Sequence, residues 1–159
     1  NRDFYREFVD YVCAFGQVKK VMFSIHNTSG VAGSDVKVEI KLNDPQNTLI
    51  LFDEYNRPRA PDKNRFPALY NLNMPSPTWD TIVESRETEH IIEIDFGKIR
   101  PKRTEISTGC LYIGSTKDID LEFTAQIFAD NLPNPVSQKM SISIKVKRRE
   151  IDLDSILND

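Results

Sequence analysis

The chain has 159 residues and a net charge of −3, with 39% hydrophobic and 28% charged residues. This length suits a single domain with a sizeable core, and this composition excludes an intrinsically disordered chain. No apolar run approaches the roughly 20 residues of a membrane-spanning helix, so we expect no membrane insertion by this segment. The acidic balance argues against a nucleic-acid footprint over the whole domain. The chain starts with Asn1, and we expect it to be a piece of a longer protein.

Residues 1–16 are predicted to form a short N-terminal helix that ends at Gly16. Aromatic and aliphatic side chains recur there every three or four positions, which places them on one helical face. They are Phe4, Phe8, Tyr11, Val12 and Phe15. We expect this stripe to pack on the rest of the domain or on a preceding domain.

After Gly16 the hydrophobic period changes from 3.6 to 2, which is typical of strands with one face in a core and one in water. Turn signals separate about seven such segments, with no helical crossovers between them. They lie around residues 20–26, 36–42, 49–52, 89–96, 104–114, 117–130 and 140–146. The pattern predicts an all-β domain over residues 17–148, an antiparallel immunoglobulin-like β-sandwich of about seven strands, followed by a polar tail at 149–159.

Three stretches resemble the strand and turn patterns of bacterial immunoglobulin-like domains of the adhesion-related repeat type. They are Val21-Met22-Phe23-Ser24-Ile25-His26-Asn27-Thr28-Ser29-Gly30 with Ala32 and Asp35-Val36-Lys37-Val38-Glu39-Ile40, then Phe96-Gly97-Lys98-Ile99-Arg100-Pro101, and Phe123 to Pro135 with Ala129-Asp130-Asn131-Leu132-Pro133. Two residues separate Asn27 from Gly30 where the family has one, and Lys102 stands where it has a glycine. The resemblance covers about two thirds of the chain and implies the fold without an activity, because sandwiches host many unrelated functions.

Residues 53–79 interrupt the strand pattern and hold five of the nine prolines. A loop of this length in a compact domain is usually functional or disordered. Aromatic and arginine side chains, which are over-represented in interface hot spots, are interleaved in it. The candidate interaction surface is Tyr55, Arg57, Arg59, Arg65, Phe66, Tyr70 and Trp79. Two alternatives stay open: the aromatics pin the loop onto the sandwich, or Trp79 and nearby tyrosines bind a carbohydrate.

Basic side chains gather at two places. The candidate basic patch is Lys98, Arg100, Lys102 and Arg103, and a second cluster is Lys145, Lys147, Arg148 and Arg149 at the end of the last strand. Such clusters bind phosphates or an acidic partner. The alternative is a solvated turn and an edge strand that lysines protect from aggregation.

Few residues favour catalysis or metal binding. The two histidines, His26 and His90, have no second ligand at metal-binding spacing, and we expect His26 to face outward and His90 inward. Cys13 and Cys110 are far apart, and we expect each to be a buried free thiol, with a disulfide between them left open. We therefore expect no catalytic residue, no metal site and no cofactor. A pocket that holds His90 with a carboxylate and Cys110 would favour an enzyme.

The function that we expect is a non-catalytic interaction or positioning module of a larger bacterial protein. Its partner would be another protein or a neighbouring domain, bound through residues 53–79 or through the helix face. The alternatives are a nucleic-acid-binding accessory domain that uses the basic clusters, and a carbohydrate-binding module. A cytoplasmic location is favoured over an extracellular one.

Overall fold

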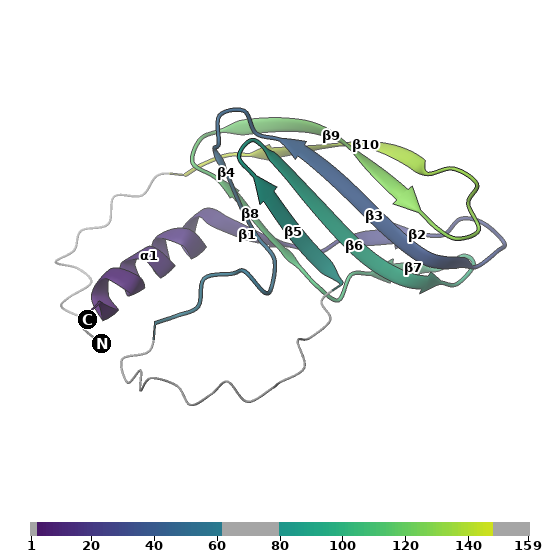
Figure 1. Cartoon of the computed structure of the whole chain (residues 1–159), viewed down its shortest axis with the longest axis horizontal. Helices are drawn as coiled ribbons and strands as arrows, with labels where there is room; N and C mark the ends of the chain where they lie inside the picture. The colour runs from purple at the N-terminus through teal and green to yellow at the C-terminus, as the bar shows by residue number, and fades with distance from the viewer. Residues whose placement is uncertain (1–2, 62–79, 148–159) are drawn as a thin grey trace.

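The computed structural model describes residues 3–61 and 80–147, which form antiparallel strands preceded by one helix (Figure 1). The helix is α1 (Phe4–Gln17). The strands are β1 (Val18–Val21), β2 (Ser24–His26), β3 (Gly33–Asn43), β4 (Leu49–Phe52), β5 (Thr81–Arg86), β6 (Glu89–Ile99), β7 (Thr104–Ile106), β8 (Leu111–Ser115), β9 (Ile119–Phe128) and β10 (Val136–Ile144). The prediction of an all-β domain with a short N-terminal helix is confirmed. The residues 62–79 and 148–159, which include the polar tail, lie outside the described part.

The strands make two layers. The larger is a five-stranded sheet in the order β10-β9-β3-β6-β5, and every neighbouring pair in it is antiparallel. The smaller layer contains the sheet β1-β8-β4 and the pair β2-β7. Since β1 leads directly into β2, and β7 into β8, the two parts of the smaller layer form one ribbon with a break in its middle (Figure 1).

Ser107 holds the ribbon together at this break. The Phe23 N–H donates to Ser107 Oγ at 3.1 Å, and the Ser107 N–H donates to the Phe23 carbonyl at 2.9 Å. The same hydroxyl donates to the Gly109 carbonyl at 2.8 Å, so a buried polar side chain replaces the missing ladder bonds. Gly109 fits because a Cβ there would lie 2.5 Å from the Asp80 carboxylate.

The prediction of about seven strands is too low, because the described residues contain ten. Two predicted strands, 20–26 and 104–114, are each divided at the break that Ser107 bridges. The third additional strand is β5, which was not predicted. It pairs with β6 across a two-residue turn, with Arg86 opposite Glu89. Its sequence carries few apolar residues, and its turn lacks the asparagine or glycine that usually marks a tight hairpin.

The hydrophobic core lies between the two layers and follows the predicted alternation. It takes Val38, Ile40 and Leu42 from β3, Ile92 and Ile94 from β6, Leu49 from β4, Leu111 and Ile113 from β8, and Ala125 from β9. Side chains of both layers therefore meet in one cluster, which is the arrangement of a β-sandwich. Strand β10 lies at the edge of the larger sheet, and most of its residues stay exposed.

Helix α1 projects from one end of the sandwich, and none of its residues is buried (Figure 1). It ends at Gln17, one residue beyond the predicted stop at Gly16. The expected packing of the aromatic stripe is seen at the last turn, where Phe15 contacts Tyr112. The prediction of a buried Cys13 is wrong, because this exposed helix leaves the free thiol in solvent.

Candidate functional site

The outer face of the β1-β8-β4 sheet, which points away from the core, is itself apolar. Val18, Cys110 and Tyr112 are buried there, with Phe15, Ile50 and Phe52 packed around them. All five residues of β8 are buried, so this strand is covered on both faces. A covered outer face next to an exposed helix makes this side of the molecule the strongest candidate for a functional surface.

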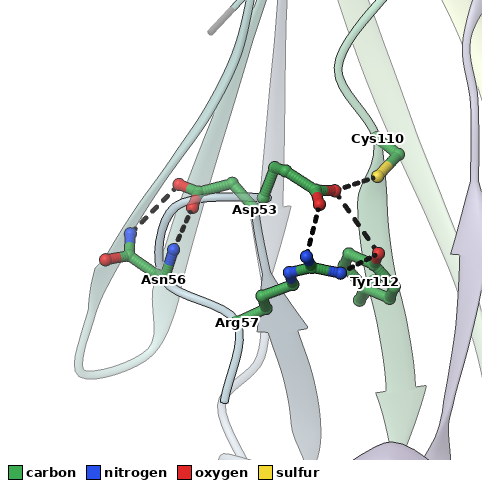
Figure 2. A network of polar contacts seen from close by, with 6 residues as sticks. Asp53, Asn56, Arg57, Cys110 and Tyr112 are labelled. Atoms are coloured by element: carbon green, nitrogen blue, oxygen red, sulfur yellow. Dashed lines mark hydrogen bonds and ion pairs between the residues drawn. The ribbon is translucent and has the colours of Figure 1, made fainter. Parts of the chain in front are cut away.

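The Asp53 carboxylate fixes the turn that follows β4 (Figure 2). It accepts hydrogen bonds from the Asn56 N–H at 2.6 Å, the Asn56 side-chain amide at 3.0 Å and the Val83 N–H at 3.1 Å. The Asp53 carbonyl also accepts the Arg57 N–H at 3.1 Å. Aspartate favours such turns because its short side chain bonds to backbone donors close by. The turn therefore holds residues 54–57 over the outer sheet face.

Glu54, Arg57, Cys110 and Tyr112 form a network on that face, called here the outer-face network (Figure 2). Arg57 Nη2 lies 3.1 Å from Glu54 Oε1, and Arg57 Nη1 donates to Tyr112 Oη at 3.2 Å. The other Glu54 oxygen accepts hydrogen bonds from Cys110 Sγ at 2.8 Å and from Tyr112 Oη at 3.3 Å. The guanidinium carbon lies 6.0 Å from the centre of the Tyr112 ring, within reach of a cation–π interaction.

The network keeps Glu54 charged and Cys110 neutral. The hydrogen bond from Cys110, and then the charge of Arg57, lower the pKa of the Glu54 carboxyl. Burial, and then the hydrogen bond to Glu54, raise the pKa of the Cys110 thiol. Burial also raises the pKa of the Tyr112 phenol. A thiol with a raised pKa is a poor nucleophile, so this arrangement suits structural support rather than covalent catalysis.

Aromatic rings connect the outer-face network to the exposed helix. Tyr112 meets Phe15 edge to face at 5.7 Å, and Phe15 lies 4.8 Å from Tyr11. Two turns earlier, Phe4 and Phe8 stack at 6.0 Å. The aromatic stripe of α1 consists of Phe4, Phe8, Tyr11, Val12 and Phe15, and the exposed Tyr5 and Val9 lie beside it on the helix.

The predicted interaction surface lies partly within the described residues. Arg57 joins the outer-face network and so holds the turn on the sandwich. Tyr55 and Arg59 are exposed. The other predicted residues, Arg65, Phe66, Tyr70 and Trp79, lie outside the described part. Carbohydrate binding through Trp79 therefore stays a prediction.

The predicted basic patch lies on the end of β6 and on the turn into β7, and its four side chains are exposed. Lys102 donates to the Thr28 carbonyl, which ties this turn to the loop after β2. Of the second cluster, Lys145 pairs with Asp120 at 3.4 Å just beyond the end of β10. Arg148 and Arg149 lie outside the described part.

His90 and Cys110 do not share a pocket. His90 is buried, as predicted, with Nδ1 2.9 Å from Ser85 Oγ and Nε2 3.9 Å from an Asp44 carboxylate oxygen. That carboxylate accepts the N–H of Leu49, which pairs with Ser115 at the far end of β8 from Cys110. His26 is exposed, as predicted, and hydrogen-bonds Thr104. His90 and Cys110 therefore do not form the grouping that would favour an enzyme.

Sequence reasoning missed Glu54, Cys110 and Tyr112 as parts of a surface. The available signal was the run Leu111-Tyr112-Ile113, which is apolar at consecutive positions and so indicates a strand covered on both faces.

Within residues 3–61 and 80–147, no helix is long and apolar enough to cross a membrane. The same ranges hold no group of three or more histidine, cysteine or acidic side chains suited to a metal ion. No protein-family model, curated protein or solved structure matches the chain.

Proposed function

We propose that this domain is a non-catalytic interaction module that binds a protein partner through α1. The observation that carries the proposal is a 14-residue helix without a single buried residue, whose Tyr5, Phe8 and Val12 side chains are 74%, 43% and 42% exposed. Exposed apolar patches of this kind are typical of interaction sites. The partner is expected to offer an apolar groove, since amphipathic helices bind by laying their apolar face into one.

The outer-face network supports this role by fixing the base of the helix. Phe15 rests on Tyr112, whose hydroxyl bonds with both Arg57 and Glu54. A helix that is fixed at one end loses less conformational entropy on binding than a free segment does, while the rest of its length stays open to a partner. Full burial of one large apolar side chain contributes about 1.5–3 kcal/mol, so each residue of the stripe that the partner covers would add to the affinity.

The experiment compares capture by the wild-type chain with capture by a Tyr5→Ser/Phe8→Ser variant, using lysate of the source organism. A photo-reactive phenylalanine analogue at position 5 identifies the protein in contact. The matched control is Ile82→Ser, which removes an exposed apolar side chain from β5. We expect the helix variant to lose a partner that the control retains. Equal capture by all three chains, or cross-linking to no protein, would contradict the proposal.

The bacterial immunoglobulin-like type of the sandwich is also part of the proposal. The packing of two antiparallel layers supports it, as do the strand and turn patterns around Asn27 and around Ala129–Pro133. Homologous sequences that align these patterns with members of that family would test the assignment.

A second candidate function is binding of a polyanion such as nucleic acid at the basic patch. Lys98, Arg100 and Arg103 are exposed and form no ion pair with any residue of the described ranges. Fluorescence anisotropy with a labelled oligonucleotide tests it, with Lys98→Glu/Arg100→Glu as the variant and Lys41→Glu as the control. Each phosphate contact that is lost should reduce the salt slope of log K by about 0.9 for duplex DNA. Absence of binding at low salt would exclude this function.

A further inference from the structure

The two edges of the five-stranded sheet differ. At the β5 edge, the Asp53 carboxylate accepts the Val83 N–H at 3.1 Å, so a side chain occupies a position that another strand would need. The β10 edge is nine residues long and pairs with β9 from Val136 to Ile144 without a register shift. It contains one charged residue, Lys139, and no proline. Natural edge strands are usually protected by charges, prolines or bulges, and β10 has little of this.

We propose that β10 is a self-association site, where it pairs antiparallel with β10 of a second copy about a two-fold axis at Met140. This inference goes beyond the proposed function of α1 and uses a different surface. The two-fold arrangement is the commonest in protein dimers, and it brings the same surface of both copies together. The larger sheets of the two copies then continue into one another through β10.

The face alternation of β10 selects this register. Val136, Met140, Ile142 and Ile144 lie on the side of β9 that faces the core, because Met140 pairs with Phe123. When the two-fold axis passes through a residue, apolar side chains of one copy lie opposite apolar side chains of the other. When the axis passes between two residues, the register shifts by one and each apolar side chain lies opposite a polar one. An axis at Met140 uses all nine residues, whereas an axis at Lys139 places two lysines opposite each other.

Charge complementarity supports a second copy as the occupant. With the axis at Met140, Lys139 lies opposite the second copy's Ser141, which itself pairs with Glu122 on β9. The backbones of Lys139 and the second copy's Glu122 are then two strand spacings apart, which is about 10 Å. A lysine and a glutamate side chain together can span this distance, because the serine between them is small. Neither Lys139 nor Glu122 forms an ion pair with another described residue. The two-fold axis produces this pair twice.

The pairing also covers exposed apolar surface. Val136 and Met140 are 48% and 42% exposed. In the dimer Met140 meets its own copy at the axis, and Val136 lies opposite the second copy's Ile144. Apolar pairs of this kind are the cross-strand contacts that stabilise antiparallel sheets.

Charge reversal tests the register. Molar mass is measured across the micromolar range by light scattering and analytical ultracentrifugation for the wild type, Lys139→Glu, Glu122→Lys and the double variant. Each single reversal should weaken dimerisation about tenfold or more, and the double variant should restore it. Lys117→Glu and Glu93→Lys are the matched controls, because they change the same charges outside β9 and β10. Circular dichroism checks that each variant is folded.

Cross-linking tests the axis directly. In a Cys13→Ser background, Met140→Cys should form an oxidised dimer, because opposite Cβ atoms lie about 5 Å apart in an antiparallel pair. Gln138→Cys should not, because this position is about 14 Å from its own copy in the proposed register. The proposal would be overturned if the chain is monomeric at all concentrations. It would also be overturned if the chain is monomeric and β10 pairs with a strand of another protein instead. A dimer that ignores both reversals or is lost in Tyr5→Ser/Phe8→Ser would overturn it as well, since that dimer uses another surface.

Discussion

Replacement of Asp53 by alanine should destabilise the whole domain and release the turn that carries Glu54 and Arg57. The Asp53 side chain is buried, with 2% of its surface exposed, and it connects β4, the turn and β5. Its removal leaves two backbone N–H groups, those of Asn56 and Val83, without their acceptor. Both N–H groups are only partly buried, so water can satisfy them in part.

The magnitude follows from those bonds. A hydrogen bond to a charged group contributes about 1.5–3 kcal/mol, and partial access of water reduces the cost of losing it. The alanine variant should therefore lose about 2–4 kcal/mol of unfolding free energy, which is a large part of the 5–15 kcal/mol typical of a domain. Asp53→Asn keeps one acceptor oxygen and should lose about 1–2 kcal/mol.

Urea unfolding followed by circular dichroism measures these differences at constant m value. Glu84→Ala is the control, because it removes an exposed carboxylate from β5 that pairs with Arg86 at 3.7 Å. Such surface pairs contribute little, so the control should stay within about 0.5 kcal/mol of wild type. A loss below about 1 kcal/mol in Asp53→Ala would refute the view that this carboxylate anchors the turn.

Three further predictions concern the reactivity of the two thiols, the pH dependence of the Glu54 contribution and the stability effect of replacing Ser107. At pH 8, Cys13 should react with a thiol reagent at the rate of a free thiol, whereas Cys110 should react only on unfolding; a single kinetic phase for both would contradict its burial under Glu54. The pKa of Glu54 is lowered from 4.5, so its stabilisation is complete above about pH 4.5 and is lost as the pH falls through the lower folded value. The difference in unfolding free energy between wild type and Glu54→Gln should therefore be constant at neutral pH and shrink below pH 4.5, and a constant difference down to pH 2 would count against the network. Ser107→Ala should cost about 1–3 kcal/mol in urea unfolding because it leaves the Phe23 N–H without its acceptor, and an unchanged midpoint would show that the break does not depend on this hydroxyl.

The sequence predicts the faces of the longer strands well, because burial on one side imposes a period of two. Ile92 and Ile94 in β6, and Ala125 in β9, lie in the core as their alternation indicates. The break at Ser107 could not be predicted, since it depends on a side-chain hydrogen bond to Phe23, 84 residues away in the sequence. Strand β5 was also missed, because pairing with β6 and the Asp53 carboxylate hold it in place more than its own apolar content does.

The candidate site was only partly predictable for a similar reason. Arg57 and Tyr55 were selected because arginine and tyrosine are frequent in interfaces, whatever their neighbours are. Glu54 and Cys110 gain their roles only when β8 comes to lie beside the turn after β4, across 56 residues of sequence. The helical period of α1 predicted its apolar stripe but not its exposure, because amphipathicity does not say what covers the apolar face.

The unlike edges of the larger sheet limit how far assembly can proceed. A sheet with two open edges adds copies at both sides, and repeated head-to-tail addition leads to a fibre. In the proposed dimer Asp53 occupies the β5 edge, so growth through β10 would stop at two copies and the assembly would have a fixed stoichiometry. The carboxylate that shapes the turn beside Tyr112 would thus also protect the chain from aggregation, at a position where neither a lysine nor a proline is present.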